Sequence, residues 1–195
     1  QPGNVPLGFM LDTDEELMRR VSRNDTTAFE EIYTRYAKRM QGFFIRMLGY
    51  DIAKAEDFTQ ELFLKVYESR SAYEEGKTFS SWAFSMAYNL CKNEYRHREV
   101  VETHELELNY DSDSTEEPAF EKIYDQAVFE NQLSISLTKL PADQLAAFTL
   151  RYNEELSVSE IARILDCPEG TVKSRLHYAL RSLSQSLSMY NPIKP

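Results

Sequence analysis

The stretch Ser157–Leu183, SVSEIARILDCPEGTVKSRLHYALRSL, decides the fold of the C-terminal part of this chain. Ser157 and Glu160 have the spacing of a capping box, in which a hydroxyl and a carboxylate satisfy backbone N–H groups at a helix start. Pro168 ends this helix and favours the first turn of another, because proline has no N–H to donate. The stretch therefore predicts two short helices joined by a tight turn.

The second of these helices is expected to bury one apolar face and to expose bases and hydroxyls. Its apolar residues recur at steps of four, four and three, at Val172, Leu176, Leu180 and Leu183. The opposite side carries Lys173, Ser174, Arg175, His177, Tyr178 and Arg181, with no acid after Glu169. A helix-turn-helix that inserts its second helix into a DNA major groove has this pattern. An ordinary helical hairpin with a solvated basic face is the alternative.

The net charge of −10 over 195 residues is concentrated in one segment. Between residues 99 and 132, eleven acids stand against a single base, Lys122, which leaves 21 acids and 21 bases in the remainder of the chain. The flanking halves are therefore neutral on balance and can each present a basic face. We expect residues 99–132 to form an acidic linker, at least as far as Pro118, that holds two lobes apart.

Composition narrows the class of protein. No apolar run approaches the roughly 18 residues that cross a bilayer, and the N-terminus lacks a signal-peptide pattern, so we expect no membrane insertion and a cytoplasmic location. The chain begins at Gln1, which leaves open whether its natural start lies upstream. Cys91 and Cys167 are far apart and are expected to be buried, reduced thiols.

The N-terminal half predicts consecutive amphipathic helices. Residues 1–11 are expected to be a loose terminus, and residues 12–23 a short helix. Thr27 and Glu30 repeat the capping-box spacing and predict the start of a longer helix that Gly49 ends. The apolar stripe of this helix comprises Phe29, Ile32, Tyr33, Tyr36, Met40, Phe43, Phe44, Met47 and Leu48. We expect it to pack in a core.

Asp51 is suited to cap the next helix, over residues 52–69. The inner face of this helix is expected to comprise Phe58, Leu62, Phe63 and Val66, and its polar surface Asp57, Gln60, Glu61 and Lys65. Such a surface is usually only solvated, but it could also dock a basic partner helix.

A fourth helix, from Thr78 to Arg98, combines aromatic rings with amides and bases. The polar residues are Asn89, Lys92, Asn93, Arg96 and Arg98. Rings interleaved with cations suit unstacked single-stranded bases, although packing in a core is the alternative for Phe79, Trp82, Phe84 and Tyr88. We favour the core for Trp82 and nucleic-acid binding for the polar residues.

Helix is expected to resume after Pro118 and to continue to Leu140, and Pro141 is expected to open another helix through Tyr152. Leu145, Phe148 and Tyr152 are expected to share the inner side of that helix. The tail, residues 191–195, has two prolines.

Five blocks of sequence together resemble the bacterial RNA polymerase sigma factors of the extracytoplasmic-function (ECF) group. The blocks are FEEIYTRYAKRM, AEDFTQELFLKVY, FSSWAFSMAYNLCKNEYR, LTKLPADQLAAFTLRY and SVSEIARILDCPEGTVKSRLHYAL. The resemblance runs from about Thr27 to Leu183 and rests on the order and spacing of the blocks.

The resemblance implies an all-α fold with two small helical domains joined by the acidic linker. Residues 12–98 would be a sigma region 2-like domain that binds core polymerase and melts the minus-ten promoter element. Residues 133–190 would be a sigma region 4-like helix-turn-helix domain that reads the minus-thirty-five element. It further implies a protein that is not an enzyme, with no catalytic residue, metal or cofactor. Its partners would be core RNA polymerase, promoter DNA and an anti-sigma factor.

The resemblance also assigns expected roles to residues. Core polymerase would bind Asp57, Gln60, Glu61 and Lys65. The melted minus-ten strand would bind Asn89, Lys92, Asn93, Arg96 and Arg98, together with the loop before Thr78. The minus-thirty-five duplex would bind Thr171, Lys173, Ser174, Arg175, His177 and Arg181. Glu94 and Glu99 depart from the more basic family pattern, which predicts a weak grip on phosphate there.

Two other classes remain open at this point. A regulator that dimerises through its N-terminal half could use the same helix-turn-helix and would bind palindromic duplex without polymerase. A nucleic-acid hydrolase is disfavoured, because Asp57 and Glu61 share a helix face without a histidine cluster or a second carboxylate site to hold metals.

Overall fold

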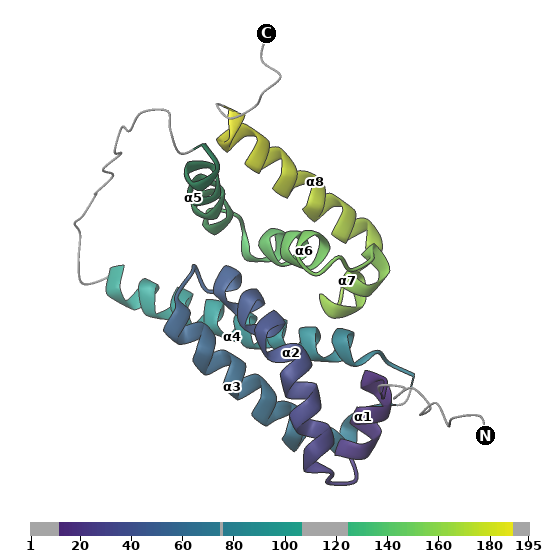
Figure 1. The fold of residues 1–195 in the computed structure, drawn as a ribbon. Coiled ribbons are helices and arrows are strands. Elements are labelled where there is room, and N and C mark those ends of the chain that lie inside the picture. The colour runs from purple at the N-terminus through teal and green to yellow at the C-terminus, as the bar shows by residue number, and fades with distance from the viewer. Residues whose placement is uncertain (1–11, 75, 107–124, 189–195) are drawn as a thin grey trace.

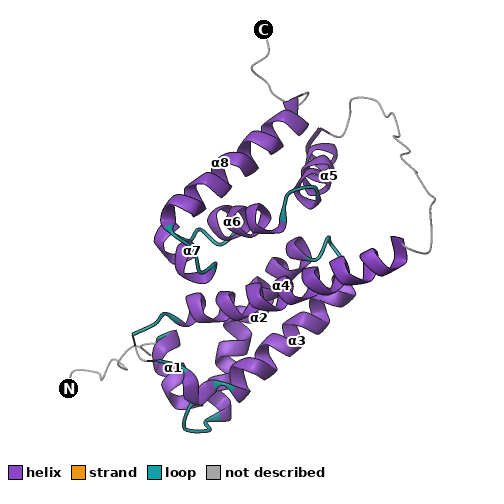
Figure 2. Cartoon of the chain, turned by 180° about the vertical axis from the view of Figure 1, so that it is seen from behind, coloured by secondary structure: helices purple, strands orange, loops and turns teal. Residues whose placement is uncertain are grey.

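The structure, a computed structural model, describes residues 12–74, 76–106 and 125–188. All regular elements in these ranges are helices, as Figure 2 shows, so the all-α prediction is confirmed. In Figure 1 they form two lobes. The first contains α1 (Asp14–Val21), α2 (Thr26–Met47), α3 (Ile52–Glu68), the 3-10 turn η1 (Arg70–Ala72) and α4 (Phe79–Leu106). The second contains α5 (Asp125–Thr138), α6 (Ala142–Tyr152), α7 (Val158–Ile164) and α8 (Glu169–Ser186).

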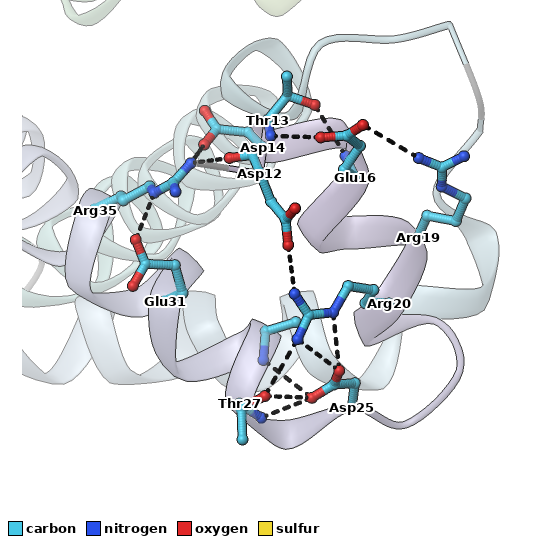
Figure 3. A network of polar contacts seen from close by, with 11 residues as sticks. Asp12, Thr13, Asp14, Glu16, Arg19, Arg20, Asp25, Thr27, Glu31 and Arg35 are labelled. Atoms are coloured by element: carbon cyan, nitrogen blue, oxygen red, sulfur yellow. Dashed lines mark hydrogen bonds and ion pairs between the residues drawn. The ribbon is translucent and has the colours of Figure 1, made fainter. Parts of the chain in front are cut away.

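The side chain of Asp25, and not a capping box of Thr27 and Glu30, sets the start of α2. The capping-box prediction at that position is therefore wrong. Asp25 is the N-cap, and its Oδ1 accepts the backbone N–H groups of Thr27 (3.0 Å) and Ala28 (3.2 Å). The Thr27 hydroxyl donates to the same oxygen (2.7 Å), and Thr27 lies in the first turn of α2 rather than at its N-cap. Arg20 of α1 donates to the other oxygen of Asp25 (2.9 Å), which fixes the turn between α1 and α2 (Figure 3).

A second set of polar contacts joins the start of α1 to α2 (Figure 3). Arg35 donates to the Asp14 carboxylate (2.9 Å) and to the backbone carbonyl of Asp12 (2.8 Å), and it also pairs with Glu31 (2.8 Å). Thr13 and Glu16 form a capping box at the start of α1, which the sequence analysis missed.

Aromatic side chains fill the core of the first lobe. Phe43 and Phe44 of α2 and Phe79 and Phe84 of α4 are fully buried, and Phe84 lies edge-on to Phe43 at 5.5 Å. Burying a side chain of this size stabilises the fold by about 1.5–3 kcal/mol. Tyr33 is the exception to the predicted stripe, because 43% of its surface is exposed. The ends of the helices follow local signals, since Gly49 has φ 73° directly after α2 and Asp51 caps α3.

Helix α4 does not end at Arg98, as predicted, but continues to Leu106. The residues from 99 to 106 contain neither glycine nor proline, and glutamate and leucine favour helix, so their acidity does not break it. The first eight residues of the predicted linker are therefore helical. Residues 107–124, which include the predicted helix restart after Pro118, lie outside the described residues.

In the second lobe, Pro141 caps α6 as expected, and α5 ends at Thr138 rather than at Leu140. The inner side of α6 differs from the prediction, because Tyr152 is 49% exposed. The residues that α6 buries are Leu145, Ala146, Ala147, Thr149 and Leu150.

The two lobes pack directly against each other, which corrects the expectation that the linker holds them apart. Helices α6 and α7 of the second lobe lie on α2 and α4 of the first, and both views of the chain show this arrangement (Figures 1 and 2). Their buried residues belong to one continuous hydrophobic core. Polar contacts also cross the boundary. The Tyr88 hydroxyl donates to Asp143 (2.6 Å), and Arg39 pairs with Glu154 (3.0 Å).

Candidate nucleic-acid interface

Local contacts define where α7 and α8 begin. The Ser157 N–H donates to Oε2 of Glu160 (2.8 Å) and the Glu160 N–H donates to Oγ of Ser157 (3.3 Å), which confirms the predicted capping box. The Ser157 hydroxyl also donates to Oε2 of Glu160 (2.6 Å), and this bond together with the one from the Ser157 N–H holds the pKa of Glu160 below its usual value. Asp166 has φ 48° in the turn, and α8 begins directly after Pro168.

The face that α8 buries is rotated slightly from the predicted one. The structure buries Val172, Leu176, Ala179 and Leu183, whereas Leu180 is 44% exposed. Steps of four, three and four follow the 3.6-residue turn as well as steps of four, four and three do. Ala179 is therefore the residue buried at this turn, and Leu180 lies at the edge of the buried face.

Most of the polar residues predicted to contact duplex DNA lie on the exposed side of α8. Exposed residues are Lys173, Ser174, His177 and Arg181, and Thr171 is half-buried near the start of the helix. Lys173, His177 and Arg181 recur at steps of four, and Ser174 lies about one turn before His177, so the four exposed residues form a single polar stripe, the α8 stripe. Apart from its chain neighbours and the backbone of its own helix, no part of the protein would lie within 4 Å of a Cβ at Gly170, so the N-terminal turn of α8 is open to an approaching group.

Arg175 differs from the other predicted duplex-binding residues, because the protein itself binds its guanidinium. It forms an ion pair with Asp143 of α6 and donates to Sγ of Cys167 (3.4 Å). Its side chain is only 21% exposed. In this conformation Arg175 therefore contacts α6 rather than solvent.

The residues predicted to contact the melted strand lie on α4. Asn89, Lys92, Asn93 and Arg96 are exposed, and their spacing of three, one and three places them on one face, the α4 stripe. Three aromatic residues of α4, Phe79, Phe84 and Tyr88, are buried in the core. Trp82 is half-buried and lies edge-on to Tyr73, with ring centroids 5.3 Å apart. The prediction that Trp82 packs in the core is therefore only partly correct.

Glu94, the acid within this helix, is paired inside the protein. Its Oε1 pairs with Lys54 of α3 and accepts a hydrogen bond from Arg98 (2.9 Å). Burial acts to raise the pKa of Glu94, but Lys54 and Arg98 outweigh burial and the net pKa is lowered. Arg98, predicted to bind the strand, is half-buried and occupied by this contact.

The residues predicted to dock on polymerase lie on α3. Asp57, Gln60 and Glu61 are exposed, and Lys65 is half-buried and pairs with Glu61 across one turn (3.5 Å). Next to them is an apolar groove between α2 and α3 that the sequence analysis missed. It is lined by Thr26, Phe29, Tyr33, Gln60, Phe63, Leu64 and Tyr67.

Aromatic contacts build the wall of this groove. Phe63 lies edge-on to Tyr33 at 4.7 Å, and Phe29 lies edge-on to Tyr67 at 5.3 Å. Leu64 is 58% exposed. Leu64 was the available signal, because it is an apolar residue that lies outside the inner face predicted for this helix.

The described residues contain no cluster of side chains suited to bind a metal ion. No group of three or more histidine, cysteine, aspartate or glutamate residues in the described ranges could hold a metal ion. None of the helices that the structure describes is long and apolar enough to cross a membrane.

Comparison with known families identifies both lobes. The family model for sigma-70 region 2 matches residues 32–100, and the model for sigma-70 region 4 matches residues 133–183. These matches correspond to the first lobe and the helix-turn-helix lobe. A chain with both regions is a sigma factor, the subunit that directs RNA polymerase to promoters.

Relatives of known function show which group of sigma factors the chain belongs to. RNA polymerase sigma-H factor of Pseudomonas aeruginosa is 28% identical over 185 residues, which cover 90% of this chain and 94% of that protein. ECF sigma factor SigW of Bacillus subtilis is 29% identical over 178 residues, covering 87% of this chain and 94% of that protein. The chain belongs to the ECF group of RNA polymerase sigma factors.

Two solved structures share the fold. RpoE of Bartonella quintana, solved in complex with the anti-sigma factor NepR, superposes with a TM-score of 0.63 at 25% identity, covering 82% of this chain and 96% of that one. CnrH, solved with the cytosolic domain of CnrY, has a TM-score of 0.68 at 19% identity, covering 91% of this chain and 99% of that one. The family membership decides between the classes left open by the sequence, and the chain is a promoter-recognising sigma factor rather than a dimeric regulator.

Proposed function

We propose that this sigma factor reads its promoter with two separate polar surfaces, the α8 stripe on duplex and the α4 stripe on the melted strand. The observation that carries the proposal is that both stripes stay exposed while the apolar side of each helix is buried. On α8, Lys173 and Arg181 supply charge for phosphates or base edges, and Ser174 and His177 supply donors and acceptors. The open N-terminal turn of α8 suits a phosphate, because free backbone N–H groups favour an anion.

On α4, the side chains suit a strand whose bases are unstacked. Lys92 and Arg96 supply charge for the backbone, and Asn89 and Asn93 can hydrogen-bond to base edges. The pairing of Glu94 with Lys54 supports this role, since the acid does not stand as an unpaired anion beside the strand.

We assign binding of core polymerase to the polar surface of α3 together with the neighbouring apolar groove. Exposed apolar side chains rimmed by polar ones are typical of protein–protein interfaces. Leu64 and Tyr33 would supply the buried contacts, and Asp57 and Glu61 would steer a basic partner helix. This protein would then work without catalytic chemistry of its own, in the cytoplasm, where polymerase and its template are located.

The two reading surfaces can be tested separately in reconstituted holoenzyme. We expect Lys173→Ala/Arg181→Ala to reduce run-off transcription by about 10-fold or more, because each lost contact weakens duplex binding by about 1–3 kcal/mol. Asn89→Ala/Lys92→Ala should also reduce run-off, and a template with a pre-melted bubble at the minus-ten element should restore transcription only for this second variant.

Lys139→Ala is the matched control. Lys139 is an exposed base in the second lobe, away from both stripes, and no contact is seen for it. Its replacement should leave run-off unchanged. If neither double variant differed from Lys139→Ala, the assignment of the stripes would be wrong.

A protein inhibitor is a further part of the proposal. RpoE of Bartonella quintana binds an anti-sigma factor, and we propose that this chain does too. A two-hybrid screen of the source genome with this chain as bait should return a partner that suppresses run-off in proportion to its concentration. A screen that returns only polymerase subunits would contradict it.

A further inference from the structure

We propose that Arg175 is a positioning residue of the recognition helix rather than a contact with promoter DNA. It fixes α8 on α6 through Asp143 and on the turn before α8 through Cys167, and so sets the orientation from which the α8 stripe reads duplex. This inference rests on the proposed function of the α8 stripe. It adds the residues that aim this stripe.

One guanidinium joins three parts of the helix-turn-helix lobe. Arg175 forms an ion pair with Oδ2 of Asp143, near the start of α6, and its Nη1 donates to Sγ of Cys167 (3.4 Å), in the turn between α7 and α8. The Arg175 side chain is only 21% exposed. A guanidinium is planar and donates along fixed directions, so two partners on different elements determine how the helix that carries it is placed.

This contact selects one of the two faces that α8 could bury. Apolar packing is not directional, and the helical period allows either Ala179 or Leu180 to lie inward. Arg175 lies about one turn before Ala179 on the same side of the helix, at the edge of the buried face. Turning α8 about its axis to bury Leu180 would carry Arg175 away from Asp143 and would turn the α8 stripe with it. The pair therefore stabilises the observed orientation of the stripe.

The charge of the pair argues against a contact between Arg175 and phosphate. Paired with Asp143, Arg175 adds no net charge with which to attract DNA. If Arg175 left this carboxylate to bind a phosphate, Asp143 would stay behind as an unpaired anion next to the duplex, which costs free energy. Lys173 and Arg181 of the α8 stripe are exposed instead and are suited to meet DNA directly.

The sign of one substitution tests the proposal. The measurement is the affinity of reconstituted holoenzyme for a fluorescently labelled promoter, mapped by sequencing the 5′ ends of its transcripts. Asp143→Ala removes an acid, so electrostatics alone would strengthen binding to DNA. We expect Asp143→Ala instead to weaken binding about 5-fold, because Arg175 and α8 lose their anchor. Unchanged or tighter binding would overturn the proposal.

Two matched controls isolate the pair. Glu169→Ala removes an exposed acid of α8 whose side chain makes no polar contact within the described ranges, and it should not weaken binding. Tyr88→Phe removes only the hydroxyl that donates to the other oxygen of Asp143 (2.6 Å), and binding should stay at the wild-type level. A loss for either control equal to that for Asp143→Ala would refute the role of Arg175.

A double-mutant cycle shows whether the two residues act as one unit. Arg175→Ala should cost about as much affinity as Asp143→Ala, and the double variant should lose no more than the larger single loss, because each change removes the same contact. Arg175→Ala should also leave the salt dependence of binding unchanged. Additive losses, or a slope of log affinity against log salt concentration smaller by about one, would show that Arg175 binds DNA itself and would contradict the proposal.

Specificity separates positioning from a purely structural role. The affinity ratio between the promoter and the same promoter with a scrambled minus-thirty-five motif should fall about 5-fold in Asp143→Ala and in Arg175→Ala. Helical circular dichroism and urea denaturation check that each variant is folded. Arg175→Gln replaces Arg175→Ala if that variant unfolds, with the same expected outcomes. A loss of stability at an unchanged affinity ratio would reduce the pair to a structural contact and would rule out positioning.

Lys173→Ala/Arg181→Ala distinguishes this inference from the function on which it rests. If this variant loses promoter affinity but Asp143→Ala does not, the α8 stripe reads duplex and Arg175 does not position it. If neither variant loses affinity, the proposed function of the stripe is wrong and the inference fails with it.

Discussion

Glu94 of α4 and Lys54 of α3 form an ion pair that joins these two helices of the first lobe. Arg98 donates to the same carboxylate oxygen from one turn further along α4 (2.9 Å). Because the Glu94 side chain is only 16% exposed, its charge is satisfied within the protein. Glu94, which departs from the more basic family pattern, therefore helps to position α4 against α3.

Replacing this acid should cost stability. We expect Glu94→Gln to lower the free energy of unfolding by about 1 kcal/mol, since a partly buried pair loses its charge while its neighbours keep theirs. Urea denaturation measures the change. Glu68→Gln, at an exposed acid of α3 for which no contact is seen, is the control and should have almost no effect. Equal losses for the two variants would show that the pair with Lys54 is not stabilising.

The N-cap of α2 should make stability depend on pH. Hydrogen bonds from the Thr27 hydroxyl, the Ala28 N–H and Arg20 lower the pKa of Asp25 to about 2, from 3.8. Between these values the unfolded state binds more protons than the folded state, so stability is present above about pH 4 and is lost as the pH falls towards 2.

Asp25→Asn isolates this effect, because asparagine keeps an acceptor oxygen for the cap and does not titrate. The stability difference between wild type and Asp25→Asn, from urea denaturation, should shrink as the pH falls from 4 to 2. A difference that stays constant over this range would refute the assignment of the lowered pKa.

The face that α8 buries can be tested with two leucines. Leu183 is 5% exposed and Leu180 is 44% exposed. We expect Leu183→Ala to cost about 2–4 kcal/mol, because it leaves a cavity. Leu180→Ala should change stability by no more than about 0.5 kcal/mol. Thermal or urea unfolding that gives similar losses for the two variants would favour the face predicted from the sequence, which buries both leucines.

The apolar groove beside α3 predicts a defect in assembly without a defect in folding. Leu64→Asp should weaken binding to core polymerase by about 10-fold or more, since a charge replaces an apolar contact at the interface. Stability should change little, because Leu64 is 58% exposed. Ile52→Asp is the matched control, on the same helix, 60% exposed and outside the groove. Equal affinities of the two variants for polymerase would exclude the groove from the interface.

The sequence predicted the features that are local. Ser157, Glu160 and Pro168 define the helix-turn-helix by contacts within a few residues, and Asp51 caps α3 for the same reason. The choice between Ala179 and Leu180 could not be made, because both fit the helical period and only the space between helices decides it. The pair Arg175–Asp143 spans 32 positions and depends on how α6 packs on α8.

The packing of the two lobes was the largest difference from the prediction. A cluster of charge in the linker indicates that the segment is polar, but not whether the lobes on either side attract each other. Contacts such as Arg39–Glu154, 115 positions apart, arise only after both lobes have folded. Helix α4 extends to Leu106 although the segment is acidic, because glutamate favours helix and acidity alone does not distinguish a linker from a solvated helix.

Sequencing the 5′ ends of transcripts made in vitro from genomic DNA, by core RNA polymerase with and without this protein, tests the central claim most directly. We predict new start sites that appear only with the protein and share two upstream motifs separated by about two helical turns. No new start sites from a well-folded sample, or start sites that share only one motif, would contradict the account of two reading surfaces.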